Sequence, residues 1–225
     1  MGNAIGQVLP LAIGVALSPI PIIAIVLMLG TPRARSNGPA FAAGWVAGLT
    51  IVGTVVLVLA SGNATQDSGA PTTWASVLKL VFGVLLLLFA ARIWHRRPAP
   101  GREAELPSWM ATIDTFAAGK SLGAGALLSG VNPKNLALTI AAATTIAEAG
   151  LPNGQEAVTL AVYILVGSLT ILAPLVVYFA MGAKATEVLD GLKTWMAAHN
   201  AAIMTVLLLV FGAKLVGDAI SGLSS

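Results

Sequence analysis

The chain has 225 residues, of which 57% are hydrophobic and 9% are charged, and its mean hydropathy is +0.89. Soluble domains carry about 25% charged residues, so this composition excludes an ordinary soluble domain and indicates a membrane helix bundle. The formal net charge is +3 and there is no cysteine, which excludes disulfides, thiolate metal sites and cysteine nucleophiles.

Six apolar stretches are each long enough to cross a bilayer, which takes about 20 residues. The six spans are predicted at residues 5–29, 40–60, 75–94, 121–147, 157–181 and 200–220. The first of them has no basic segment before it and is long for a signal peptide, so it is counted as a span. The sequence therefore predicts an all-α membrane protein with six transmembrane helices.

Positive charges alternate along the connections between these spans. The connections at 31–39, 95–120 and 182–199 contain Lys or Arg, whereas those at 61–74 and 148–156 contain neither. Basic loops stay on the cytoplasmic side of a membrane. With six spans, this pattern predicts that both termini lie outside.

Residues 106–119 (LPSWMATIDTFAAG) differ from the spans. Pro107 suits the first turn of a helix, and the apolar residues Trp109, Ile113 and Phe116 fall at helical spacing. Asp114 and Thr115 lie on the other side. We predict an interfacial amphipathic helix within a cytoplasmic linker over 98–119, with an ordinary loop helix as the alternative.

Two proline motifs lie near the middle of the first and fourth spans: Ser18-Pro19-Ile20-Pro21 and Asn132-Pro133-Lys134-Asn135. Proline lacks the backbone N–H, so inside a helix it frees a carbonyl one turn upstream and breaks or kinks the helix. In hydrocarbon, freed groups are tolerated only where protein or a water-lined cavity satisfies them. Paired breaks in two halves of a chain therefore indicate the binding site of a transporter.

The two halves of the chain share their order of features. The tetrapeptide Leu-Val-Phe-Gly occurs at 80–83 in the third span and again at 209–212 in the sixth. Each half contains three spans, so the halves must insert in opposite orientations. The sequence thus predicts two inverted-topology three-helix repeats, at 1–97 and 120–225.

Each break is predicted to start a new half-helix whose positive dipole end lies at the membrane centre, where it forms an anion site. Asn132 is predicted to cap one half-helix and Ser18 the other. Lys134 adds a full charge near mid-membrane, where an ionisable residue suggests function. A cap on the carbonyls freed at the break is the alternative role for Lys134. The predicted substrate-binding residues are Ser18, Pro19, Pro21, Asn132, Pro133, Lys134 and Asn135.

All nine acidic residues lie in loops or at span ends. Divalent-cation sites and carboxylate proton relays need such groups within the membrane, so the site suits a phosphate, sulfate or carboxylate group. Asp114, Asp190 and Asp218 remain candidates for proton coupling. With no nucleotide loop or catalytic pattern, we expect no enzymatic activity, no cofactor or metal, and no nucleic-acid partner.

Four segments of the chain match a family pattern: SPIPIIAIVLML at 18–29, TPRARSNGPAFAAGWVAGL at 31–49, WMATIDTFAAG at 109–119 and LLSGVNPKNLALTIAAATTI at 127–146. In these residues the chain resembles the GAP (Sap) family of peptidoglycolipid- or sulfolipid-addressing proteins of actinobacterial inner membranes. That family lies within the wider superfamily of LysE-type exporters. The Asn-Pro-Lys motif is shared with LysE-type exporters generally, and the stretch around TPRAR is specific to the GAP group.

The resemblance implies a six-span exporter in the cytoplasmic (inner) membrane that helps glycolipids, or their precursors, toward the cell envelope. The positions that match the family motifs are Ser18, Pro19, Pro21, Thr31, Pro32, Arg33, Arg35, Asn132, Pro133, Lys134 and Asn135.

Three functional hypotheses follow. The first is an exporter or flippase for an anionic lipid-linked or glycolipid substrate, whose headgroup engages Lys134 after Arg33 and Arg35 gather it at the cytoplasmic face. An apolar groove open to lipid would favour this hypothesis. The second is a LysE-type exporter of a small solute such as an amino acid, which a closed aqueous cavity would favour. The third is a non-transporting scaffold of a lipid export machine, which solidly packed breaks would favour. Expected partners are the bilayer, the lipid substrate, envelope-lipid biosynthesis or export proteins, and a second copy of the chain.

Overall fold

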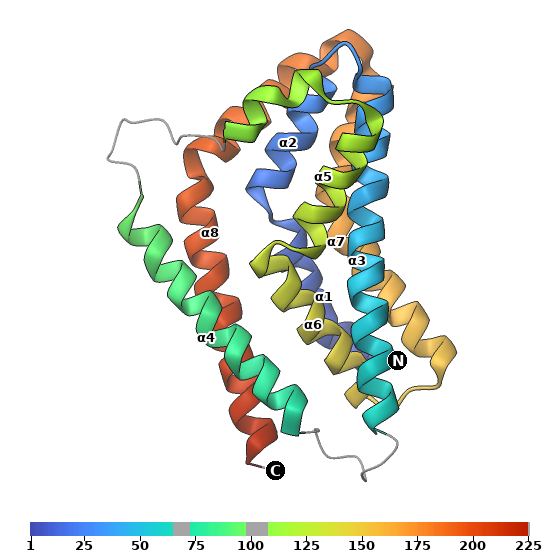
Figure 1. Cartoon of the computed structure of the whole chain (residues 1–225), viewed down its shortest axis with the longest axis vertical. Coiled ribbons are helices and arrows are strands. Elements are labelled where there is room, and N and C mark those ends of the chain that lie inside the picture. The colour runs from blue at the N-terminus through green and yellow to red at the C-terminus, as the bar shows by residue number, and fades with distance from the viewer. Residues whose placement is uncertain (65–72, 98–107, 225) are drawn as a thin grey trace.

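The structure is a computed structural model, and it describes residues 1–64, 73–97 and 108–224, in which there is no β-strand (Figure 1). The elements are α1 (Gly2–Ala16), α2 (Pro19–Leu29), α3 (Ala34–Ala64), α4 (Thr73–His95), the 3₁₀ helix η1 (Ser108–Thr115), α5 (Ala118–Gly130), α6 (Pro133–Glu148), α7 (Asn153–Met181), the 3₁₀ turn η2 (Gly182–Lys184) and α8 (Ala185–Leu223). A broken helix pair followed by two long helices occurs twice along the chain.

The chain is a multi-pass membrane protein by the length and apolarity of its helices. Four helices could each cross a bilayer, namely α3, α4, α7 and α8, and the bent pair of α1 and α2 makes a fifth candidate. The predicted fourth span, 121–147, corresponds to α5 and α6 and is not among these candidates. Most of α6 is buried inside the protein, so its small and polar residues do not have to be compatible with lipid.

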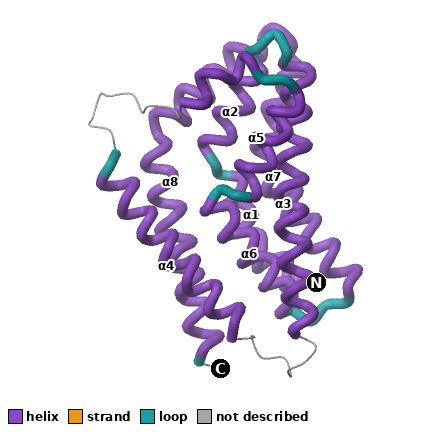
Figure 2. Tube along the Cα trace, in the orientation of Figure 1, coloured by secondary structure: helices purple, strands orange, loops and turns teal. Residues whose placement is uncertain are grey.

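Both proline motifs break their helices as predicted. Pro19 is the first residue of α2 and Pro133 the first residue of α6, where the fixed φ and missing N–H of proline suit the first helical turn. At the first break, α1 and α2 are bent by 54°. Figure 2 shows the two breaks as short loops near the middle of the molecule. Two helices thus end there and two begin.

Glycines bring α3 and α5 into backbone contact. A methyl group on Gly44 would lie 1.9 Å from the carbonyl oxygen of Leu122, and one on Gly125 would lie 2.1 Å from that of Phe41. One GxxxG spacing of the sequence, at Gly44 and Gly48, therefore serves packing within the chain. The other, at 119–123, has no neighbour close to either glycine.

The repeated tetrapeptides meet in space. Gly83 of α4 and Gly212 of α8 pack against each other, and methyl groups on them would lie 3.0 Å from the partner glycine's carbonyl oxygen. The two helices run side by side as a pair at one edge of the molecule (Figure 1). The similarity of the two tetrapeptides is therefore accompanied by a direct contact between equivalent positions.

The segment predicted as an interfacial amphipathic helix is instead the 3₁₀ helix η1. Met110 and Ile113 are buried, and Trp109 and Phe116 pack partly buried against the core. This apolar side lies against α2, so protein rather than lipid covers it. Residues 98–107, the rest of the predicted linker, lie outside the described ranges.

Candidate functional site

The last carbonyl groups of α1 all receive hydrogen bonds at the first break. The donors come from two other helices, α6 and α7, and from Ser18 in the break itself. Ser18 Oγ donates to Val15 O at 2.7 Å, Thr170 Oγ1 of α7 donates to Ala16 O at 2.6 Å, and Lys134 Nζ of α6 donates to Gly14 O and, over a long 3.5 Å, to Leu17 O. Because Pro19 removes the usual helical donor, these side chains supply what the backbone cannot.

Lys134 is buried, with 3% of its surface exposed, and its ammonium group lies against the C-terminal end of α1. The C-terminal end of a helix carries partial negative charge, so a cation there is stabilising. In this structure Lys134 therefore acts as the cap that the sequence suggested as the alternative role. Lys134 lines none of the hollows described below.

The two predicted caps have different outcomes. Asn132 Oδ1 accepts a hydrogen bond from the backbone N–H of Lys134 at 3.1 Å, which caps α6 as predicted. Ser18 makes no side-chain cap on α2, so that prediction is wrong. Its hydroxyl turns back to α1 because the carbonyl of Val15, freed by Pro19, lies within reach.

Asn135 connects the two breaks. Its Oδ1 lies 3.2 Å from Ser18 Oγ, and its Nδ2 donates to Leu128 O of α5 at 3.0 Å. One turn further along α6, the hydroxyl of Thr139 lies 3.0 Å from that of Tyr163 in α7. The side chains of Ser18, Lys134 and Asn135 are all buried in this network. The structure thus brings together polar residues that are more than a hundred positions apart in the sequence.

The prolines of the predicted site frame this network. Pro19 and Pro21 are buried in the first turn of α2, whereas Pro133 is exposed at the start of α6. They shape the breaks through the backbone.

Arg33 and Arg35 lie away from the breaks, exposed at the end of the molecule where η1 packs. Arg33 Nη1 donates to Phe116 O at 3.4 Å, beside a shorter bond of 2.9 Å from Asn37 Nδ2 to the same oxygen. The TPRAR stretch is therefore held to the segment that leads into α5. Its two guanidinium groups remain accessible at that face.

The three candidate acids for proton coupling are scattered. Asp114 is exposed on η1, and Asp190 pairs with Lys193 at 2.7 Å on an exposed face of α8. Asp218 pairs with Lys214 at 2.6 Å near the other end of α8. None of the three belongs to the hydrogen-bond network at the breaks. Within the described ranges, no group of three or more His, Asp or Glu residues could hold a metal ion.

An apolar groove runs between α3 and α7. None of the residues that line it was among the site residues predicted from the sequence. It consists of two adjoining hollows of about 570 Å³ and 420 Å³ that share Val46, Thr50 and Leu172. Small and apolar side chains dominate its walls, with a few hydroxyls such as Ser168. No sequence pattern signals the groove, because it depends on how two distant helices lie side by side.

The groove lies at the same depth as the two breaks. Gly48 of α3 packs against Ala126 and Ser129 near the end of α5, and its neighbours on α3 line the groove. On the other wall, Gly167 of α7 packs against Val15 at the end of α1. An occupant of the groove would therefore lie level with the Lys134 network.

A family model described as Sap, sulfolipid-1-addressing protein, matches residues 8–221 of the chain. The chain belongs to the Sap family. The match includes both proline motifs, the network around Lys134 and both walls of the groove. No match was found among the curated proteins or the solved structures. As a Sap-family protein, the chain is related to sulfolipid-addressing membrane proteins, and its helices are compatible with membrane transport.

Proposed function

We propose that this Sap-family chain is a non-enzymatic exporter or flippase that moves an anionic lipid-linked or glycolipid substrate across the cytoplasmic membrane toward the cell envelope. The observation that carries the proposal is the apolar groove between α3 and α7, at the depth of the two helix breaks. A lipid substrate needs an apolar path for its tails beside a polar path for its headgroup. We propose that the groove receives the tails and that the buried break network, at the same level, receives the headgroup once Lys134 is released.

The proposed architecture is six spans in two inverted three-helix repeats, with α5 and α6 together as the fourth span. The repeated order of elements supports it, as does the mutual packing of Gly83 and Gly212. In an inverted repeat, equivalent residues near the pseudo-two-fold axis contact each other. The exposed Arg33 and Arg35 lie at the end of the molecule that the basic loops assign to the cytoplasm.

Lys134 is proposed to exchange partners during transport. In the structure, its ammonium group binds the carbonyl end of α1. An anionic headgroup entering from the groove would compete with those carbonyls, because a full negative charge attracts an ammonium more strongly than partial charges do. Release of Lys134 would leave α1 without its cap and loosen the packing of α1 against α6. Binding of the headgroup would thus be coupled to a change in helix packing.

A non-transporting scaffold is the second candidate, and the burial of Lys134 favours it. With 3% of its surface exposed, Lys134 has no open route to a substrate in this structure. A scaffold would use the groove to hold a lipid beside a separate export protein.

The test replaces Lys134 with Gln, which keeps N–H donors for the α1 carbonyls and removes the charge. Purified protein is reconstituted in liposomes that contain phosphatidylglycerol with a fluorescent acyl chain, and lipid movement between leaflets is measured by quenching from outside. We expect the wild type to move the lipid and Lys134→Gln to slow it about tenfold or more, since a charge-assisted hydrogen bond contributes about 1.5–3 kcal/mol. Lys193→Gln, which removes an exposed charge paired to Asp190, is the matched control.

Two outcomes would contradict transport through this site. If the Lys134→Gln variant moves the lipid at the wild-type rate, Lys134 has no part in the mechanism. A wild-type protein that moves the lipid no faster than empty liposomes, yet retains it through purification, would support the scaffold.

A further inference from the structure

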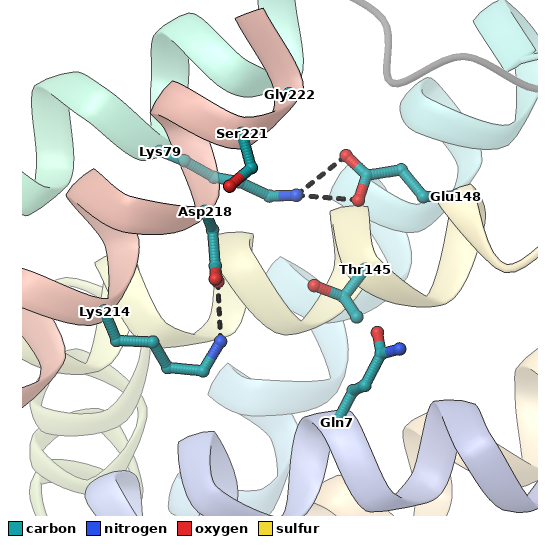
Figure 3. Close-up of a pocket in the computed structure, with 8 residues that line it drawn as sticks. All are labelled: Gln7, Lys79, Thr145, Glu148, Lys214, Asp218, Ser221 and Gly222. Atoms are coloured by element: carbon teal, nitrogen blue, oxygen red, sulfur yellow. Dashed lines mark hydrogen bonds and ion pairs between the residues drawn. The ribbon is translucent and has the colours of Figure 1, made fainter. Parts of the chain in front are cut away.

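A polar pocket lies at the end of the molecule away from η1, among α1, α4, α6 and α8. Figure 3 shows its lining, and the cavity has a volume of about 390 Å³. The residues around it are Gln7, Lys79, Thr145, Glu148, Lys214, Asp218, Ser221 and Gly222. A cavity of this size is within the range of small-molecule binding sites.

Two ion pairs dominate the pocket. Lys79 Nζ of α4 donates to both carboxylate oxygens of Glu148 of α6, at 2.8 Å and 2.7 Å, and Lys214 lies 2.6 Å from Asp218 on α8. The Lys79 side chain is 7% exposed and that of Glu148 is 26% exposed. Figure 3 shows the first pair reaching across the pocket from opposite helices. Only Lys79 is buried, whereas the side chains of Lys214 and Asp218 are 36% and 38% exposed, so the pocket combines one buried ammonium group with charges that a ligand can reach.

The lining is electrically balanced, which narrows the class of ligand. Two ammonium groups face two carboxylates, so neither a simple anion nor a simple cation meets a net opposite charge. A ligand that both donates and accepts hydrogen bonds suits such a lining, because ammonium groups only donate and carboxylates only accept. Sugar hydroxyls do both.

Uncharged polar groups complete the lining. Gln7 of α1 and Thr145 of α6 lie below the Lys79–Glu148 pair in Figure 3, with Thr145 one turn before Glu148 on the same helix. Within the described part of the chain, their side chains have no hydrogen-bond partner. A second hollow of about 300 Å³ adjoins the pocket and shares Gln7, Thr145 and Glu148 with it. Amide and hydroxyl groups that are free to bond, beside neutralised charges, form a surface for a hydroxyl-rich group.

We propose that this pocket binds the sugar headgroup of a glycolipid on the outer side of the membrane. This inference rests on the proposed function in two respects. The proposed function gives the side of the membrane on which the pocket opens, and it gives the lipid to which the sugar is attached. It assigns a site at the opposite end from Arg33 and Arg35, and separate from Lys134. A headgroup released from the break region would find its next polar contacts here.

The experiment measures lipid retention by native mass spectrometry on the full chain released from nanodiscs. The probes are monoglucosyl diacylglycerol, diacylglycerol and phosphatidylglycerol with identical acyl chains, and free glucose. The variants are Gln7→Leu, Thr145→Val and the two combined, which remove hydrogen-bonding groups and leave both ion pairs intact. Gln155→Leu, an exposed position near the start of α7 outside the pocket, is the matched control.

We expect the wild type to retain the glucosyl lipid more than the two lipids without sugar. Each single variant should lower that preference about fivefold, as expected for one lost hydrogen bond, the combined variant should lower it further, and Gln155→Leu should keep it. Binding of free glucose that competes with the glucosyl lipid would place recognition in the sugar alone, whereas a requirement for the acyl chains would assign the site to the whole glycolipid.

Equal retention of the three lipids, or an unchanged preference in the double variant, would overturn the proposal and leave the ion pairs as a link between α4 and α6. A preference for phosphatidylglycerol that falls in the variants would reassign the pocket to anions. The outcome is independent of transport: a chain that binds the glucosyl lipid here but moves no lipid keeps this site and loses the proposed function.

Discussion

Gly83 of α4 and Gly212 of α8 pack directly against each other, although 129 positions separate them. A methyl group on Gly83 would lie 3.0 Å from Gly212 O and 2.9 Å from the backbone nitrogen of Val216. A methyl group on Gly212 would lie 3.0 Å from Gly83 O. The two glycines are the last residues of the repeated tetrapeptide, so the equivalence seen in the sequence corresponds to a contact in the fold.

Gly83→Ala and Gly212→Ala should each destabilise the α4–α8 pair, because backbone atoms cannot move aside as a flexible side chain does. Overpacking of this kind costs about 1–3 kcal/mol. The midpoint of thermal unfolding in detergent measures the effect. Gly217→Ala in α8 is the matched control, since no neighbouring atom lies within 4 Å of its added methyl group. Equal midpoints for all three variants would contradict the close packing.

Thr170→Val should destabilise the first break. The substitution keeps the shape of the side chain but removes one of the two donors to Ala16 O, so that only the backbone N–H of Ser18 still bonds to this carbonyl. A lost hydrogen bond costs about 1 kcal/mol. The comparison is Thr194→Val, whose hydroxyl bonds only to Asp190 O in its own helix on an exposed face. A thermal midpoint shift no larger for Thr170→Val than for Thr194→Val would show that the contact contributes nothing.

Ala47→Phe should block the groove between α3 and α7. Ala47 lines the groove and is exposed, so a phenyl ring can occupy the hollow without entering the core. We expect slower lipid movement in liposomes and less co-purified lipid, with an unchanged midpoint of thermal unfolding. Ala91→Phe on the exposed face of α4 adds the same ring away from the groove. If both variants move lipid at the wild-type rate, the groove is not the path of the lipid tails.

Single cysteines test the orientation, because the native chain contains none. The cysteine of Ser36→Cys, beside the basic TPRAR stretch, should react with a membrane-impermeant maleimide only after the cells are opened, since basic segments face the cytoplasm. The cysteine of Asn153→Cys, in a connection without Lys or Arg, should react in intact cells. Labelling of Ser36→Cys and Asn153→Cys from the same side would contradict the proposed crossing by α5 and α6.

Local chemistry made part of this structure predictable. Pro19 and Pro133 begin helices because proline has a fixed φ and no N–H, whatever surrounds it. Asn132 caps α6 by accepting a hydrogen bond from the backbone N–H of Lys134, only two residues further along the chain. Ser18 was mispredicted because a cap on its own helix competed with a carbonyl of the preceding helix, and only the bend of the chain brought that carbonyl near.

The number of spans shows the limit of hydropathy. Residues 121–147 read as one apolar stretch, but the structure divides them between α5 and the largely buried α6 and does not add them to its four or five candidate spans. The predicted electrostatics of the site were also incomplete. From the sequence, the charge of Lys134 was expected among helix N-termini, whereas the structure places it on the C-terminal end of α1.

By itself, the sequence determined that this is a helical membrane protein, that two helices break at prolines, and that one buried cation lies at a break. These properties depend on composition and on atoms a few residues apart. The tertiary structure decided which carbonyls Lys134 binds, where the groove runs, and that Lys79 and Glu148 meet across a polar pocket. Those contacts join residues from 69 to 120 positions apart. They exist only once the packed helices have fixed the relative position of each side chain.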